Sequence, residues 1–144
     1  MPEVARGTTG LVLVDSSAWI AALRSGGEGS SRVALDTLLA DRGAATCPVI
    51  VTELLQGAIS ARGLEALADE LRWLPLLSME QAGEPAGRAA WHLRRQGITV
   101  PTTDLLIAAT ALVHGARLMH QDRHLRLIAQ ALGVETLEPE PASS

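Results

Sequence analysis

Residues 11–20 read LVLVDSSAWI, and this stretch decides the fold. Its first four residues form a short apolar run without polar alternation, which is typical of a strand buried on both faces of a parallel sheet. Asp15 ends the run, and a helix is expected to follow over 18–24. An acidic residue at the carboxyl end of such a strand lies where parallel sheets bind their ligands.

The rest of the chain alternates short apolar segments with amphipathic ones. Further strands are expected at 44–47, 73–77, 117–119 and 134–137, and helices at about 31–41, 48–58, 64–71, 80–96, 104–113 and 124–132. This order predicts an α/β fold, a three-layer sandwich with a parallel central sheet of four to five short strands flanked by helices. The helix over 104–113 is apolar almost all round and is expected at the centre.

Length and composition fit one domain with one core, since the chain has 144 residues and 47% apolar content. We expect this domain over 11–137, between a flexible N-terminus at 1–10 and a disordered tail at 138–144. No apolar run approaches a membrane span, no secretory signal is recognised, and the single Cys47 has no partner for a disulfide. A cytoplasmic location is therefore expected.

The charge balance restricts how a nucleic acid could be held. The net charge is −4, which argues mildly against a nucleic-acid binder, although it would be neutral without the four acids discussed next. All twelve basic residues are arginine, and the chain has no Phe or Tyr. Stacking of bases on aromatic platforms is thus mostly excluded, and nucleic acid would be held through its backbone charge and shape.

Four acidic residues stand beside the expected elements: Asp15, Glu53, Asp104 and Asp122. Two follow strands, and Glu53 and Asp104 are expected in the first turn of a helix. Each alone is explained as well by helix capping or by a solvated charge. Together they suggest a cluster, and clustered carboxylates require a cation because they repel one another. Mg²⁺ or Mn²⁺ suits oxygen ligands and phosphate substrates, so all four acids are candidate metal ligands and catalytic residues of a nuclease.

A family resemblance extends this interpretation over nearly the whole chain. The stretches LVLVDSSAWI, VTELLQG and TTDLLIAATALVHGARLMHQDRHL resemble the successive motifs of PIN-domain ribonucleases, in particular the VapC-type toxins. The acids Asp15, Glu53, Asp104 and Asp122 match the four acidic positions of that family in order, and Ser17 and Thr103 match its supporting polar positions. The resemblance implies an endoribonuclease toxin that cleaves RNA, forms a homodimer and binds a cognate antitoxin.

The sequence departs from the family pattern around Asp122. The family often has Thr, Asp and Phe where this chain has His120, His124 and Leu125. Two histidines four residues apart on one helix face can bind zinc, but Asp122 and Arg123 suggest a loop, so supporting or surface roles are favoured for both. Asp122 is therefore ranked below the other three acids as an essential ligand.

Other side chains receive simpler interpretations. Trp19 and Trp91 are expected in the core or an interface rather than as base stackers. Arg94 and Arg95 are expected to complement a helix C-terminus rather than to contact RNA.

Three other functions stay open at this point. The chain could be a catalytically silent PIN-like module that binds RNA or protein, or a metal-dependent DNA nuclease, since RNA is favoured by family likeness only. It could also be an α/β domain whose four acids lie apart in space. The sequence does not choose between Mg²⁺ and Mn²⁺.

Overall fold

Strand β1, Val12–Val14, lies inside the sheet, and all three of its side chains are fully buried. The computed structural model describes residues 9–24 and 29–139, and these contain a four-stranded parallel sheet in the order β2-β1-β3-β4. The other strands are β2, Ala44–Ala45, β3, Arg117–Met119, and β4, Thr136–Leu137. Because every pairing is parallel, the carboxyl ends of these strands lie along one edge.

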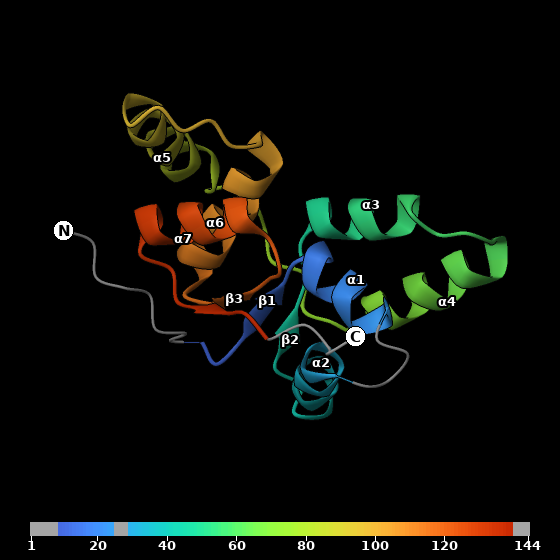
Figure 1. The fold of residues 1–144 in the computed structure, drawn as a ribbon. Helices are drawn as coiled ribbons and strands as arrows, with labels where there is room; N and C mark the ends of the chain where they lie inside the picture. Colours follow the sequence, from blue (N-terminus) through green and yellow to red (C-terminus); the bar gives the residue numbers. More distant parts are fainter. Residues whose placement is uncertain (1–8, 25–28, 140–144) are drawn as a thin grey trace.

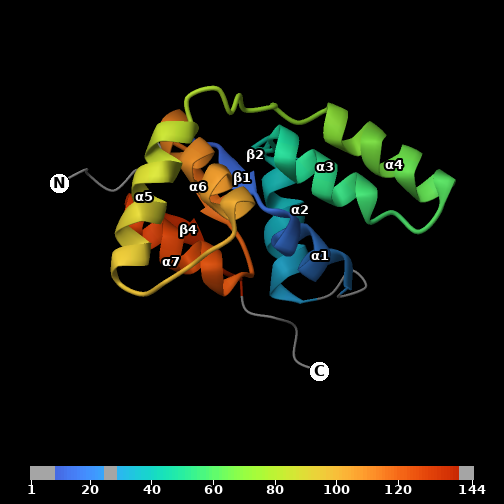
Figure 2. The ribbon, with the colours of Figure 1, turned by 90° about the horizontal axis from the view of Figure 1, so that it is seen from above.

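Seven helices of the described residues surround this sheet (Figure 1). They are α1, Ser16–Arg24, α2, Ser30–Ala40, α3, Pro48–Gln56, α4, Ala61–Arg72, α5, Gly83–Arg95, α6, Thr102–His114, and α7, Arg123–Leu132. Seen from above, α5, α6 and α7 gather on one side of β1 and β2, and α1 to α4 lie on the other (Figure 2). The predicted α/β sandwich is confirmed, and its sheet has four strands.

Helix α6 is the most deeply buried helix of the first group, as its apolar composition predicts. Residues Ile107, Ala108, Ala109, Thr110 and Ala111 are all buried, so neighbours contact it around most of its circumference. Gly115 ends the helix with a φ of 65°, a left-handed conformation that glycine adopts without strain. The chain enters β3 two residues later, at Arg117, so the end of α6 lies beside the start of this strand.

The two tryptophans differ in their environments. Trp19 of α1 is buried in the core, as expected. Trp91 of α5 is 57% exposed, because α5 turns Ala86, Ala89 and Leu93 toward the core and position 91 lies on another side of the helix. The guanidinium of Arg95 lies 4.9 Å from the centre of its ring, a cation–π contact.

The strand expected at 73–77 does not form. Leu76 makes only an isolated parallel bridge with Thr46, whose backbone amide donates to the carbonyl of Pro75. Pro75 has no backbone N–H, so the segment cannot extend this bridge into a regular ladder. Helix α5 begins at Gly83 rather than near 80, and α4 begins at Ala61, capped by the Ser60 hydroxyl.

The two terminal expectations fall mostly outside the described residues. Residues 1–8 and 140–144 are not described, whereas Glu138 and Pro139 are. Glu138 forms a bidentate ion pair with Arg126 of α7, with an Nη2–Oε1 distance of 2.6 Å. Among the described helices, none combines the length and the apolar character that crossing a bilayer requires.

A pair of matched leucine substitutions tests where the core lies. Leu118 of β3 is fully buried, so Leu118→Ala should lower the free energy of unfolding by roughly 2–5 kcal/mol, because it leaves a cavity in the centre of the sheet. Leu127→Ala removes the same atoms from a side chain of α7 that is 37% exposed and should cost less than half as much. Urea unfolding measures both, and equal losses would contradict this packing.

Candidate metal centre

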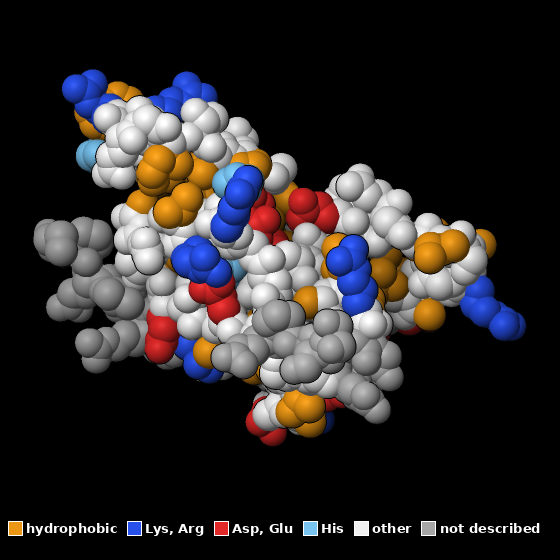
Figure 3. Space-filling view, in the orientation of Figure 1, with side chains coloured by type: hydrophobic (Ala, Val, Ile, Leu, Met, Phe, Trp, Pro, Cys, Tyr) orange, Lys and Arg blue, Asp and Glu red, His pale blue; other side chains and the backbone are white. Residues whose placement is uncertain are grey.

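The structure brings the four predicted acids to the carboxyl edge of the sheet. Asp15 follows β1, Asp122 follows β3, and Asp104 is the third residue of α6. Glu53 lies in the second turn of α3 rather than the first, because the helix begins at Pro48. In the space-filling view acidic side chains gather between the α6–α7 part of the molecule and α3, with histidine and arginine side chains beside them (Figure 3).

These carboxyl groups act on one another electrostatically. Burial is the largest cause of the raised pKa of Asp104 and of Glu53. Beyond burial, the charges of Asp122, Asp15 and Glu53 raise the pKa of Asp104, and those of Asp15 and Asp122 raise that of Glu53. Such coupling requires the four groups to share one neighbourhood. The expectation that the acids gather is therefore confirmed, and the alternative in which they are unrelated in space is wrong.

Asp15 is the most deeply buried member of the group, with 3% of its surface exposed. Its Oδ2 accepts hydrogen bonds from the backbone amide of Ser17 at 2.9 Å and from the Ser17 hydroxyl at 2.5 Å. Its Oδ1 is also buried but has no hydrogen-bond partner. An unsatisfied buried carboxylate oxygen is costly, and a cation is the partner that best removes this cost. The residues present thus fit a divalent cation.

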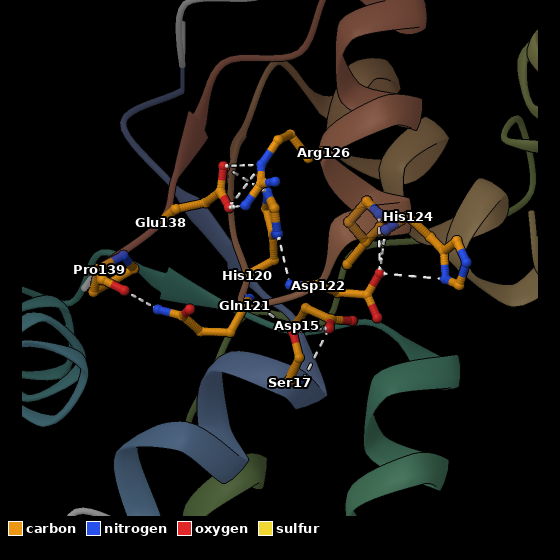
Figure 4. A network of polar contacts seen from close by, with 10 residues as sticks. Asp15, Ser17, His120, Gln121, Asp122, His124, Arg126, Glu138 and Pro139 are labelled. Carbon is orange, nitrogen blue, oxygen red and sulfur yellow. Dashed lines mark hydrogen bonds and ion pairs between the residues drawn. The ribbon is translucent and has the colours of Figure 1, made fainter. Parts of the chain in front are cut away.

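Ser17 links the two loops that carry Asp15 and Asp122. Its hydroxyl donates to Asp15 and accepts the backbone amide of Gln121 at 3.0 Å, so it joins the start of α1 to the loop after β3 (Figure 4). Thr103 is exposed in the first turn of α6, beside Asp104, and its supporting role stays a prediction. Ser16, which was not among the predicted site residues, donates its hydroxyl to Glu53 Oε1 at 3.1 Å.

Burial and mutual repulsion shift Asp15, Glu53 and Asp104 toward their protonated forms. Burial raises the pKa of Asp104 to about 7, aided by the charges of Asp122, Asp15 and Glu53. Burial also raises the pKa of Asp15 and of Glu53, and the hydrogen bonds from Ser17 and Ser16 oppose these shifts. Without a cation the cluster is therefore under electrostatic strain at neutral pH.

Asp122 has two tasks at once. Its Oδ1 caps α7, accepting the backbone amides of His124 at 2.7 Å and Leu125 at 3.1 Å. Its carboxylate also belongs to a group with Asp104 and His124 whose ligand atoms all lie within 4.8 Å of one another. The helix cap and the metal ligand, which seemed to be alternatives in the sequence, are compatible because the carboxylate has two oxygens.

The two histidines have separate positions. His120 is fully buried at the end of β3, where its Nδ1 accepts the backbone amide of Asp122 at 3.1 Å. His124 lies in the first turn of α7 and approaches the acids, so the pair does not form a zinc site on one helix face. Sequence reasoning gave His124 a supporting or surface role. One feature of the sequence could have predicted that His124 lies beside the acids: it follows by two residues an acid, Asp122, that caps a helix.

Comparisons with known proteins agree with this geometry. The family model described as PIN domain matches residues 12–131, and the chain therefore belongs to the PIN-domain family. Its sequence relatives indicate which group within this family the chain belongs to. Ribonuclease VapC11 of Mycobacterium tuberculosis is 33% identical over 130 residues, covering 87% of this chain and 96% of that protein. Ribonuclease VapC32 of the same organism is 32% identical and covers 89% and 98%. This chain is a VapC-type member of the family.

Solved structures support the same fold. The DNA-bound VapBC structure from Salmonella typhimurium aligns with a TM-score of 0.69 at 21% identity, covering 89% of this chain and 97% of that chain. VapBC2 from Rickettsia felis, bound to a promoter DNA fragment, also aligns with a TM-score of 0.69, at 16% identity and 90% coverage of this chain and 99% of that one. At these identities the likeness shows the fold.

The raised pKa of Asp104 predicts how the metal-free protein responds to pH. In the folded chain Asp104 holds its proton up to a pKa of about 7, whereas in the unfolded chain it releases the proton near the ordinary aspartate pKa of 3.8. The contribution of Asp104 to stability should therefore be complete below about pH 4 and be lost as pH rises from about 4 to 7, by on the order of 1 kcal/mol after a discount for solvent screening of this half-buried group. Asp104→Asn should raise the melting temperature at pH 8 and flatten the pH dependence. Melting curves in a chelator measure this, with Asp69→Asn as an exposed control, and an unchanged slope in Asp104→Asn would contradict the assignment.

Proposed function

We propose that this protein is a metal-dependent endoribonuclease that acts as the toxin of a toxin–antitoxin pair. The observation that supports this most directly is the unpartnered, buried Oδ1 of Asp15 within a cluster of four acids. Membership of the VapC-type group supports RNA as the substrate, because the named relatives are ribonucleases. The nuclease domain extends over about residues 11–137.

The proposed catalytic residues are Asp15, Glu53, Asp104 and Asp122, which would hold Mg²⁺ or Mn²⁺ through their carboxylate oxygens. When bound, such an ion promotes attack of water on the phosphodiester and neutralises charge on the phosphate oxygens. The chain's own part is to hold the carboxylates in place and oriented. Ser17 fixes one oxygen of Asp15, Ser16 fixes one of Glu53, and the first turn of α7 fixes one of Asp122.

The proposed partners follow from the relatives. The structures similar in fold from Salmonella typhimurium and Haemophilus influenzae are of VapBC, which supports the inference that this chain binds a cognate antitoxin. The homodimer is proposed from the family resemblance. An antitoxin arginine that entered the acid cluster would displace the cation, because the same carboxylates bind a guanidinium well. We expect the protein to act in the cytoplasm.

Removing one ligand charge tests the function. Asp104→Asn keeps the side-chain shape but removes a charge from the cluster, so RNA cleavage in Mn²⁺ or Mg²⁺ should fall by about 100-fold or more. Asp15→Asn should behave alike, and Glu53→Gln should be milder. Cleavage of a labelled RNA pool by purified protein, free of antitoxin, measures all three.

The matched control is Glu84→Gln, which removes an exposed carboxylate of α5. It should cleave at the parental rate. If Asp104→Asn also does, the site assignment is wrong. If the parent yields no metal-dependent product from RNA, the silent binding module gains support, and preferential cleavage of DNA would support the other alternative. Growth arrest on expression, relieved by the neighbouring gene, tests the toxin role separately.

Ser17→Ala tests the support of the cluster. This change removes the hydroxyl that joins Asp15 to the backbone of Gln121, while the backbone amide of Ser17 still holds Asp15. We expect metal affinity to fall by about tenfold, as for other residues that orient metal ligands. Calorimetric titration with Mn²⁺ measures this. Ser78→Ala, in a loop after α4, is the control, and equal affinities of Ser17→Ala and the parent would exclude the positioning role.

A further inference from the structure

We infer that His124 is a metal ligand, and that with Asp104 and Asp122 it makes a mixed imidazole–carboxylate site that favours transition-metal dications over Mg²⁺. This inference rests on the metal site of the proposed function and defines which ions that site takes. The ligand atoms of the three residues all lie within 4.8 Å of one another. Each residue is only partly exposed, so the three groups are partly shielded from solvent.

The local geometry already suits a shared ion. His124 Nδ1 lies 3.7 Å from Asp122 Oδ1. That distance places the imidazole beside the Asp122 carboxylate. Two ligands at roughly 2.0–2.2 Å from one ion lie about 3–4 Å apart, and the ligand atoms of the three residues already lie within 4.8 Å of one another. Asp122 Oδ1 is occupied by the helix cap, and the second oxygen of this residue makes no contact among those drawn in Figure 4. That oxygen is available to an ion.

The backbone determines where the imidazole points. Asp122 is the N-cap of α7, and His124 is the second residue of the helix. Its neighbours Arg123 and Leu125 are exposed and buried respectively, so the side chain of His124 lies at the boundary between core and solvent, on the side of the acids. Figure 4 shows its ring beside the Asp122 carboxylate.

A second observation, on a residue outside this trio, supports a cation site beside these three side chains. Asp15 Oδ1 is buried without a hydrogen-bond partner, and Figure 4 shows the carboxyl group of Asp15 turned toward that of Asp122. A buried carboxylate oxygen without a partner is rare unless an ion or a water satisfies it. Asp15 therefore lies beside the carboxylate through which Asp122 takes part in the trio.

The chemistry of imidazole determines which ions gain. Mg²⁺ prefers oxygen ligands and gains little from a nitrogen donor. Affinity for an imidazole site rises from Mn²⁺ to Cu²⁺ and falls again at Zn²⁺, which still binds nitrogen ligands more tightly than Mn²⁺ does. A site of carboxylates alone lacks this discrimination. His124 therefore shifts the balance from Mg²⁺ toward the transition metals.

Binding measurements on the metal-free, full-length protein test this without any reference to activity. Mn²⁺ bound to the parent should show a ¹⁴N coupling from imidazole in pulsed EPR. The His124→Asp variant should lose it, and its ratio of Mn²⁺ to Mg²⁺ affinity should fall by about tenfold in competition titrations. Its affinity for Zn²⁺, measured by calorimetry, should fall further.

Two further variants serve as a control and as an independent repeat of the test. His92→Asn changes a histidine of α5 that packs edge-on against Trp91, and it should keep both the coupling and the parental ion ratio. His124→Gln keeps a similar size without an imidazole and should repeat the loss. Asp at position 124 suits the N-terminus of α7, so the variant should fold, and melting curves in a chelator check this.

The outcomes separate this inference from the proposed function. Absence of a ¹⁴N coupling in a parent that binds Mn²⁺, or an unchanged ion ratio in His124→Asp, overturns the inference even if RNA is cleaved. A coupling lost only in the His124 variants supports it even if no RNA is cleaved, in which case the nuclease proposal fails alone.

Discussion

Repulsion among carboxylates at one edge of the sheet is the constraint on which the rest of the site depends. The four acids come from two helices and two strand ends, and their charges add to burial in raising the pKa of Asp104, Glu53 and Asp15. The fold holds them together through contacts that do not depend on a metal: the hydroxyls of Ser16 and Ser17 and the first turn of α7. These donors stabilise the charged forms, so the site is preorganised for a cation at a cost in the stability of the metal-free chain.

The sequence predicted the sheet well because buried parallel strands have a direct signature. The apolar runs before Asp15 and before His120 became adjacent strands in register, with Val14 opposite Met119. Because parallel strands end at the same edge of a sheet, the sequence was enough to predict that Asp15 and Asp122, which follow these two strands, lie at that edge. Residues 73–77 carried a similar apolar signal, but Pro75 limited them to one bridge with Thr46, which is a matter of hydrogen-bond donors rather than hydrophobicity.

Features that depend on side-chain direction were less predictable. The rotational position of each residue about its helix axis decides that Trp91 faces solvent and that Glu53 reaches the cluster. An error of one or two residues in the predicted start of α3 also changes the turn in which Glu53 lies. Glu138 was expected in a disordered tail. It lies instead 3.9 Å from the Nε2 of buried His120 and pairs with Arg126, a long-range contact that no local pattern encodes.

Asp122 shows why simple and functional explanations of one residue need not compete. A helix N-cap uses one carboxylate oxygen, and the two backbone amides it accepts hold the other oxygen in a fixed direction. Because the cap also determines where α7 begins, it fixes the direction in which the second residue of the helix projects. The same hydrogen bonds that end the loop after β3 therefore place both Asp122 and His124 against Asp104, so a substitution at 124 changes the donor set of the site without moving its backbone.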